Sequence, residues 1–311
     1  MPEIPDQLRL AERTLRALAH DADLPAKIGV HPRPDSSFAH AMPAWLRGPG
    51  PGATGDLLGI KWVAGFPANR TLDIPAINAT LLLSDASTGE LRAVLDAGGI
   101  TAVRTAAVSG VAVARWAPTG LGRPLEIAVV GAGVQGESHV AMLATVAPGC
   151  SLRLHDRDGE RAARLADTAR ARGTFHTVVT SDTAVDAISG ADVVVTLVSF
   201  GPDRQQVPPD AFAATRLVVT VDYDMCLPAV VAREVELFLV DEVGQFLANR
   251  SGGVFVGYPD PAGIIGEHLD TPSVDGTIVV THLGVGLADV VFGDAILAAA
   301  EREGRGVLLP R

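Results

Sequence analysis

The chain contains 311 residues, carries a formal net charge of −11 and is 48% hydrophobic. This acidic balance argues against nucleic acids and anionic membranes as partners, because both are bound by basic surfaces. The length exceeds what one hydrophobic core usually supports, so we expect two domains.

Several sequence features indicate a cytoplasmic protein. The best candidate for a membrane span, residues 100–117, is interrupted by two arginines. Residues 1–10 are polar and acidic, without the apolar segment of a signal peptide. The two cysteines, Cys150 and Cys226, are too few for a disulfide framework and indicate a reducing compartment. The eight histidines are scattered, so we expect no metal site.

The first 120 residues or so have the pattern of a β-rich domain. Hydrophobic segments at residues 57–63, 79–84 and 91–96 predict strands of an antiparallel sheet. A helix of small residues is predicted over residues 104–115. The last helix, predicted over residues 288–303, is expected to return and pack on this first domain.

From about residue 125 to residue 280, strands and helices alternate regularly. Near-continuous apolar runs such as residues 192–198 are typical of parallel strands that are covered on both faces. The pattern therefore predicts a doubly wound parallel α/β sheet. Its predicted strands are residues 126–130, 151–155, 177–180, 192–198, 217–221, 237–240 and 277–281, and its predicted helices are residues 134–147, 159–172, 184–189 and 227–234.

The first predicted strand of this sheet runs into a glycine-rich turn. Residues 129–136 read Val-Val-Gly-Ala-Gly-Val-Gln-Gly, a Gly-x-Gly-x-x-Gly pattern between a strand and a helix. Gly131 permits the tight turn, Gly133 lets a pyrophosphate approach the backbone, and Gly136 lets the helix pack on the strand. Val134 and Gln135 begin the helix, where unpaired N–H groups hold phosphates. The segment predicts a dinucleotide-binding site.

The acidic residue that completes this pattern is Asp156, 20 residues after Gly136 and at the end of the second predicted strand. Its carboxylate is expected to accept hydrogen bonds from ribose hydroxyls, which favours NAD over NADP. Arg157 and Arg161 lie close enough in sequence to attract a 2′-phosphate, so NADP stays open as an alternative.

Four further segments resemble the ornithine cyclodeaminase/µ-crystallin family. They are residues 42–44 (Met-Pro-Ala), 59–69 around a lysine, 99–109 around an arginine, and 283–289 with a glycine–acid motif. The resemblance covers nearly the whole chain. It implies a Rossmann NAD-binding domain, residues 121–287, inserted in a β-rich α+β domain that binds substrate and forms a homodimer, residues 1–120 with 288–311. Substrate would bind in a crevice between the two domains.

The resemblance also implies the chemistry, which is hydride transfer at an amino or imino carbon next to a carboxylate. Arg104 and Arg33 would bind the carboxylate, since a guanidinium can pair with it through two N–H groups. Lys61 would assist proton transfer, and its pKa would fall if it were desolvated near Arg104. Thr105 and Asp289 would lie beside the cofactor.

An acidic group is expected to handle the proton on the substrate nitrogen, and the resemblance places it in residues 219–224. Asp224 is the choice, with Asp222 as the alternative. Two departures weaken ornithine as the substrate. The family's cyclodeaminases carry a Gly-Lys pair shortly after this aspartate, where residues 225–228 read Met-Cys-Leu-Pro. His40 stands where those enzymes place a glutamate near the distal amine, so it is expected to contact the substrate.

The sequence thus predicts an NAD(H)-dependent, ornithine cyclodeaminase-like enzyme that acts on a small amino or imino acid. Alternatives are a ketimine reductase, an amino-acid dehydrogenase, or a µ-crystallin-like protein that binds nicotinamide without turnover. Structural roles also stay open: Lys61 as an ordinary lysine, Arg104 as an ion-pair partner, and Asp289 as the cap of the last helix.

Overall fold

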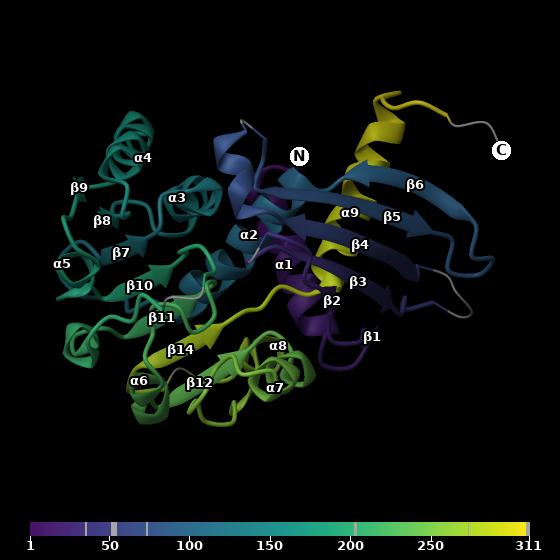
Figure 1. Cartoon of the computed structure of the whole chain (residues 1–311). Coiled ribbons are helices and arrows are strands. Elements are labelled where there is room, and N and C mark those ends of the chain that lie inside the picture. The colour runs from purple at the N-terminus through teal and green to yellow at the C-terminus, as the bar shows by residue number, and fades with distance from the viewer. Residues whose placement is uncertain (35, 51–54, 73, 202–203, 273, 309–311) are drawn as a thin grey trace. The chain divides into compact units, whose positions relative to one another are not determined.

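Figure 1 shows the computed structural model of the chain, which describes residues 1–34, 36–50, 55–72, 74–201, 204–272 and 274–308. The chain forms two compact units. The first unit consists of Met1–Arg104 and Val285–Arg311, and the second of Thr105–Gly284. The chain passes between the units after residues 104 and 284, whereas the sequence predicts the boundaries after residues 120 and 287; those predicted boundaries stay a proposal.

The first unit is built on an antiparallel sheet with the strand order β1-β3-β4-β5-β6, and β2 pairs with the other end of β3. Helix α9 packs against β3, β4 and β5, and helix α1 packs against α9. The elements are α1 (Ile4–Ala17), β1 (Ala22–Asp23), β2 (Ile28–Val30), β3 (Phe38–Leu46), β4 (Leu57–Gly65), the 3-10 turn η1 (Pro67–Thr71), β5 (Ile77–Ser84), β6 (Leu91–Asp96), the start of α2 (Gly98–Trp116) and α9 (Gly286–Arg302).

The two faces of this sheet differ in what covers them. Alternate residues of β4, from Leu57 to Gly65, are buried on the face that α9 covers, which we call the inner face. The opposite, outer face carries exposed apolar side chains. They lie on one face because residues paired across neighbouring strands point to the same side of the sheet. Those side chains are Ile28, Val30, Trp62, Leu82 and Val94, with exposed fractions from 37% to 64%.

The second unit is built on eight parallel strands in the order β13-β12-β14-β11-β10-β7-β8-β9. The strands are β7 (Glu126–Val130), β8 (Ser151–His155), β9 (Thr177–Thr180), β10 (Val193–Thr196), β11 (Leu217–Thr220), β12 (Leu237–Val240), β13 (Gly263–Ile264) and β14 (Ile278–Thr281). The helices are α3 (Val134–Val146), α4 (Gly159–Ala171), α5 (Ala184–Ile188), η2 (Pro209–Phe212), α6 (Ala229–Glu234), α7 (Val243–Ser251) and α8 (Ile265–His268).

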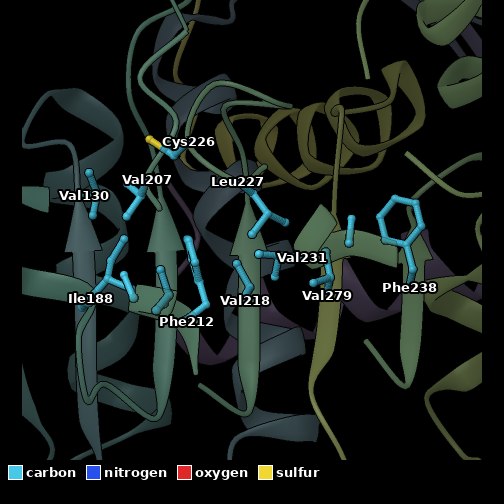
Figure 2. Packing of buried hydrophobic residues seen from close by; sticks show 14 of the residues in the cluster. Val130, Ile188, Val207, Phe212, Val218, Cys226, Leu227, Val231, Phe238 and Val279 are labelled. Atoms are coloured by element: carbon cyan, nitrogen blue, oxygen red, sulfur yellow. The ribbon is translucent and has the colours of Figure 1, made fainter. Parts of the chain in front are cut away.

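Apolar side chains on one face of the parallel strands form the core of this unit. Figure 2 shows Val130, Val218, Val279 and Phe238 projecting from neighbouring strands toward side chains of the covering segments, such as Leu227. Burying each side chain of this size stabilises the fold by roughly 1.5–3 kcal/mol relative to leaving it exposed. The strands are apolar on both faces because the sheet is covered on both.

The predicted fold class is confirmed, since the chain combines a doubly wound parallel sheet with a β-rich α+β unit. Helix α2 begins at Gly98, six residues before the predicted start at residue 104, because two glycines at the start concealed a helix that tertiary packing stabilises. Strand β3 was not predicted, since its Pro43 and alanines are poor strand signals. Within the described ranges, no helix is long and apolar enough to cross a membrane.

Candidate functional site

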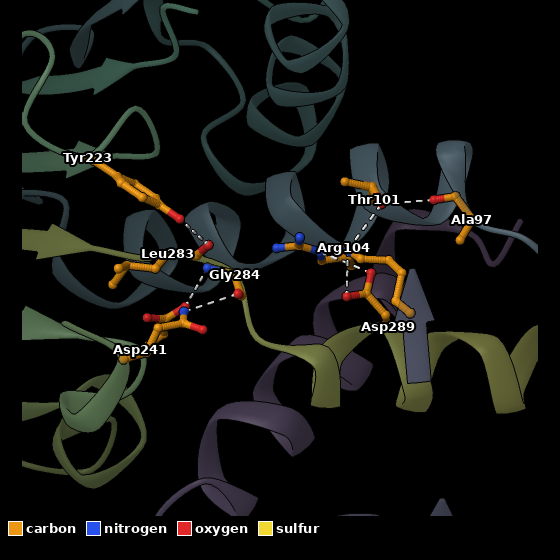
Figure 3. Close-up of polar contacts among 10 residues, drawn as sticks. Ala97, Thr101, Arg104, Tyr223, Asp241, Leu283, Gly284 and Asp289 are labelled. Atoms are coloured by element: carbon orange, nitrogen blue, oxygen red, sulfur yellow. Dashed lines mark hydrogen bonds and ion pairs between the residues drawn. The ribbon is translucent and has the colours of Figure 1, made fainter. Parts of the chain in front are cut away.

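The first unit contains a buried group of three charged side chains (Figure 3). Lys61 Nζ lies 2.7 Å from Asp289 Oδ2, and Arg104 Nε lies 3.4 Å from Asp289 Oδ1. Lys61 also donates a hydrogen bond of 3.3 Å to Thr101 Oγ1, which in turn donates to the carbonyl of Ala97. Lys61 and Asp289 are at most 1% exposed, and Arg104 is 6% exposed. One carboxylate therefore holds two cations in place.

Each of these side chains is aimed by its local structure. Lys61 is one of the alternate buried residues that form the inner face of β4. Thr101 and Arg104 are three residues apart on α2 and therefore lie on the same side of that helix. Asp289 is in the first turn of α9, where a negative charge is favoured by the helix dipole. The sequence suggested Asp289 as a residue beside the cofactor, and the structure gives it contacts with Lys61 and Arg104.

The environment of Lys61 makes it easy to deprotonate. Burial lowers the pKa of Lys61 to about 7, with the positive charge of Arg104 acting in the same direction and Asp289 opposing it. At neutral pH the amine is thus close to the point where it can donate or accept a proton.

The other two sequence-predicted residues of this unit lie near one end of the sheet. His40 is half-buried on β3 and stacks on Phe38, with ring centroids 4.7 Å apart. It faces the same side of the sheet as Lys61, because His40 pairs with Val63 and Met42 pairs with Lys61. Arg33 is exposed in the turn between β2 and β3, and no hydrogen bond or ion pair within the described residues joins it to the Lys61 group.

In the second unit, the glycine-rich turn adopts the geometry that the sequence predicts. Gly131 has φ +118°, and a Cβ there would lie 2.7 Å from the carbonyl oxygen of Leu197. A Cβ on Gly136 would lie 2.5 Å from the carbonyl oxygen of Gly131. Gly133 is exposed at the N-cap of α3, and a Cβ there would meet open space. The turn is therefore closed toward the sheet and open toward a ligand.

Asp156 lies beside this turn. It accepts hydrogen bonds from the backbone N–H of Ala132 at 2.7 Å and of Asp158 at 2.9 Å. Arg157 is exposed, and Arg161 forms an ion pair with Asp158 at 3.1 Å. A carboxylate in this position is suited to ribose hydroxyls and repels a 2′-phosphate.

The first turn of α3 presents further groups that a dinucleotide would use. Val134 is 67% exposed, and the helix has no side-chain N-cap, so its first N–H groups are available to phosphate oxygens. The side-chain oxygen of Gln135 is buried and has no hydrogen-bond partner in the structure. The residues present therefore fit a nicotinamide dinucleotide.

The two candidate acids are held differently. Asp222 is buried and accepts hydrogen bonds from Thr196 Oγ1 at 2.7 Å and from the N–H of Val198 at 3.2 Å. Burial raises the pKa of Asp222 to about 6, although these hydrogen bonds oppose the shift. Asp224 accepts a hydrogen bond from the N–H of Phe255 at 3.0 Å and pairs with Arg204 at 3.2 Å, both through Oδ2.

Tyr223, between the two acids, has φ +61° and donates a hydrogen bond of 3.2 Å to the carbonyl of Leu283. The next residue, Gly284, is held on both sides of its backbone (Figure 3): its N–H donates to Asp241 at 2.7 Å, and its carbonyl accepts from Gln245 at 3.2 Å. The segment that leads to α9 is thus fixed within the second unit.

Sequence analysis missed a buried network in the second unit. Ser109 Oγ lies 2.8 Å from His139 Nε2 and 2.8 Å from His282 Nε2. His139 Nδ1 lies 2.7 Å from the carbonyl of Gln135, which can only accept, so Nδ1 carries the proton. Burial lowers the pKa of His139 to about 4, so its ring is neutral and Nε2 accepts from Ser109. His282 Nε2–H then donates to Ser109. The network thereby fixes the first turn of α3.

Thr105 is buried on α2, directly after Arg104. Ser109, His139 and His282 carried no sequence signal of their own, since single buried serines and histidines are common structural residues. Thr101 could have been found from its spacing of three residues before Arg104. Within the described ranges, no group of three or more histidine, cysteine, aspartate or glutamate side chains could hold a metal ion.

The sequence matches the family model described as "Ornithine cyclodeaminase/mu-crystallin family" over residues 3–208. The chain belongs to the ornithine cyclodeaminase/mu-crystallin family. Among curated relatives, it is 35% identical over 316 residues to "Nodulation efficiency protein NfeD" of Rhizobium meliloti, covering 97% of this chain and 92% of that protein.

The chain is also similar to Delta(1)-pyrroline-2-carboxylate reductase 1 of Burkholderia multivorans. It is 37% identical over 174 residues, which are 55% of this chain and 52% of that protein. Among solved structures, the Delta(1)-pyrroline-2-carboxylate reductase of Thermococcus litoralis, in complex with NADH and L-proline, superposes with a TM-score of 0.81. That match has 20% identity and covers 99% of this chain and 96% of the other, which shows a shared fold.

We expect Ser109→Ala to lower the free energy of unfolding by about 1–3 kcal/mol, because the buried His282 N–H loses its acceptor in the network. Urea unfolding followed by tryptophan fluorescence measures the change. Ser189→Ala is the matched control, since Ser189 is exposed at the end of α5. Equal unfolding midpoints for the two variants would show that the network does not stabilise the unit.

Proposed function

We propose that this protein is an NAD(H)-dependent enzyme that reduces the C=N bond of an imino acid next to its carboxylate. The observation that carries the proposal is Lys61, a buried amine with a pKa lowered to about 7 that is held by Asp289 beside Arg104. A structural lysine has no need of this arrangement, whereas a proton donor at neutral pH requires it.

NADH, when bound, would supply the hydride for this reaction. Arg104 would bind the substrate carboxylate, since its guanidinium offers several N–H groups and, among the described residues, contacts Asp289 Oδ1 through Nε. The protonated Lys61 would donate to the imine nitrogen, so that carbon gains the hydride and nitrogen the proton. Asp289 would keep the Lys61 amine oriented throughout.

We propose NAD as the cofactor, held by the turn from Gly131 to Gly136 and by Asp156. The fit rests on the open N-terminus of α3 and on the carboxylate beside the turn. Arg157 is exposed beside Asp156, so NADPH is the comparison that a cofactor assay needs.

Two other activities compete with imine reduction. In cyclodeamination, the same hydride chemistry would run in both directions on a diamino acid, with Asp224 as the acid at the substrate nitrogen. Asp224 uses Oδ2 for both Arg204 and Phe255, which leaves Oδ1 as the oxygen that we propose for this role. In a protein that only binds nicotinamide, the perturbed Lys61 would have no function, so we place this reading last.

We also propose a homodimer that forms through the outer face of the antiparallel sheet. Ile28, Val30, Trp62, Leu82 and Val94 leave an exposed apolar surface on this face, and such a surface usually marks an interface. A second copy of the same sheet would cover it with matching apolar residues.

The first prediction of the proposed function concerns Lys61. Purified protein with NADH and Δ1-pyrroline-2-carboxylate is expected to oxidise NADH, followed at the nicotinamide absorbance band, more efficiently than NADPH. Lys61→Ala should lower kcat/KM by about 100-fold or more, because it removes the proton donor. Thermal unfolding of the variant checks that it folds. NADH binding without oxidation by the wild-type protein would instead favour the binding role.

The second prediction is the pH dependence of this reduction. Lys61 is protonated below its pKa of about 7 and loses the proton above it. Because the proposed step needs the protonated amine, kcat/KM should be constant at low pH and fall about tenfold per pH unit once the pH exceeds about 7. The measurement is a pH profile of NADH oxidation between about pH 5.5 and 9. A profile that stays flat to the upper limit would contradict this role for Lys61.

A third prediction tests the dimer. Trp62→Glu places a charge in the middle of the apolar outer face and should convert a dimer to a monomer, measured by light scattering coupled to size-exclusion chromatography. Val256→Glu is the control, since Val256 is an exposed apolar residue of the second unit. A wild-type protein that already elutes at the protomer mass would refute the dimer.

A further inference from the structure

Four aromatic side chains of the second unit lie in a row that runs from its core to its surface. The ring centroids of Phe246 and Phe255 are 4.8 Å apart, those of Phe255 and Tyr223 are 5.5 Å apart, and those of Tyr223 and Phe200 are 4.8 Å apart. Phe246 and Phe255 are fully buried, Tyr223 is half-buried, and Phe200 is 46% exposed. We call these four residues the aromatic row.

The middle of the aromatic row is rigidly held. Tyr223 has φ +61°, and its hydroxyl donates a hydrogen bond to the carbonyl of Leu283 (Figure 3). Phe255 has φ +57°, and its N–H donates to Asp224 Oδ2 at 3.0 Å. A positive φ is unfavourable for side chains of this size and persists only where the surrounding structure imposes it, most often at functional sites. The exposed ring of Phe200 therefore packs edge-on against a fixed neighbour.

The outer end of the row lies at the carboxyl edge of the parallel sheet. The segment that follows β10 is fixed there by two backbone hydrogen bonds: the N–H of Leu197 donates to the carbonyl of Val130 at 2.7 Å, and the N–H of Val198 donates to Asp222 Oδ2 at 3.2 Å. Val130 is the last residue of β7, directly before the glycine turn. Phe200 is two residues beyond Val198, so it belongs to the edge where the cofactor is proposed to bind.

The strand order indicates which part of a dinucleotide this edge would meet. The order β9-β8-β7-β10-β11 reverses its direction in sequence between β7 and β10, and each half of such a sheet takes one nucleotide of the pair. Asp156 follows β8, so it marks the adenosine half, and the turn after β7 marks the pyrophosphate. The nicotinamide half is then directed to the carboxyl ends of β10 and β11, which Phe200 and Tyr223 follow.

We propose that Phe200, supported by Tyr223, packs against the nicotinamide ring of the bound cofactor. The inference rests on the proposed binding of NAD at the glycine turn. A single exposed apolar side chain needs no explanation by itself. Phe200 differs because the ring behind it is fixed and because a planar aromatic ligand is expected beside it, a pairing that aromatic side chains stabilise beyond the area they bury. Phe200 would thus position the ring from which the hydride is transferred.

The experiment compares two ligands that differ in the nicotinamide ring. Calorimetric titration with NADH and with ADP-ribose, which lacks this ring, is carried out on the wild-type protein and on Phe200→Ala. We expect Phe200→Ala to raise the Kd for NADH by about fivefold to tenfold, the size of one lost aromatic contact, and to leave the Kd for ADP-ribose unchanged. Phe200→Tyr keeps the ring and should bind both ligands as the wild type does.

Leu247→Ala is the matched control, because Leu247 is 38% exposed on α7 of the same unit. It should leave the Kd for both ligands unchanged. The fluorescence of bound NADH gives a second readout, since emission from the dihydronicotinamide ring moves to shorter wavelength in apolar surroundings. This shift, measured at saturating NADH, should be smaller in Phe200→Ala than in the wild type and unchanged in Leu247→Ala.

The two ligands also separate this inference from the proposed cofactor. If the wild-type protein binds neither NADH nor ADP-ribose, the proposed cofactor fails and the Phe200 contact fails with it. If the wild type binds both, but Phe200→Ala weakens them equally or weakens neither, the cofactor proposal stands and the contact is rejected. A loss confined to NADH, together with the smaller emission shift, supports the contact.

Discussion

The carboxylate of Asp289, buried between Lys61 and Arg104, is the interaction on which the rest of the first unit depends. Removing charged groups from water costs several kcal/mol per ion even after the protein relaxes, and this cost is offset only where partners are well placed. With Asp289 at 2.7 Å from Lys61, the amine is neither fully stabilised as a cation nor driven to neutrality. Its pKa near 7 is the balance of burial against one shared carboxylate.

That balance requires the sheet to keep its register. Lys61 reaches Asp289 because every second residue of β4 faces α9, while Trp62, one position on, faces the opposite side. A shift of one residue would exchange the two faces and place the apolar outer residues against the ionic group. The same alternation brings His40 to the side of Lys61. One antiparallel sheet thus separates a buried inner face, which carries Lys61, from an exposed apolar outer face.

The second unit is constrained at the glycine turn in a similar way. Gly131 and Gly136 are closely packed, whereas Gly133 faces open space, so the turn has one rigid side and one accessible side. Asp156 fixes the turn through the N–H of Ala132, and the Ser109 network fixes the first turn of α3 through Gln135. Hydrogen bonds between side chains and the backbone therefore hold in advance the groups that a dinucleotide would contact, which lowers the entropy cost of binding it.

The sequence by itself determined the fold class, the glycine turn and the position of Asp156, because these depend on local periodicity and on residues close together in the chain. It also indicated Lys61 and Arg104, through short motifs that resemble those of a family.

Only the tertiary structure decided which side chains contact one another in the two buried polar groups. Asp289 is 185 residues from Arg104, and His282 is 173 residues from Ser109, so neither contact leaves a local pattern. Periodicity shows which face of a strand or helix is buried, but the residue that meets it is chosen by the packing of elements that are distant in sequence. The pKa of Lys61 follows from that packing, because burial and charge proximity are properties of the folded chain.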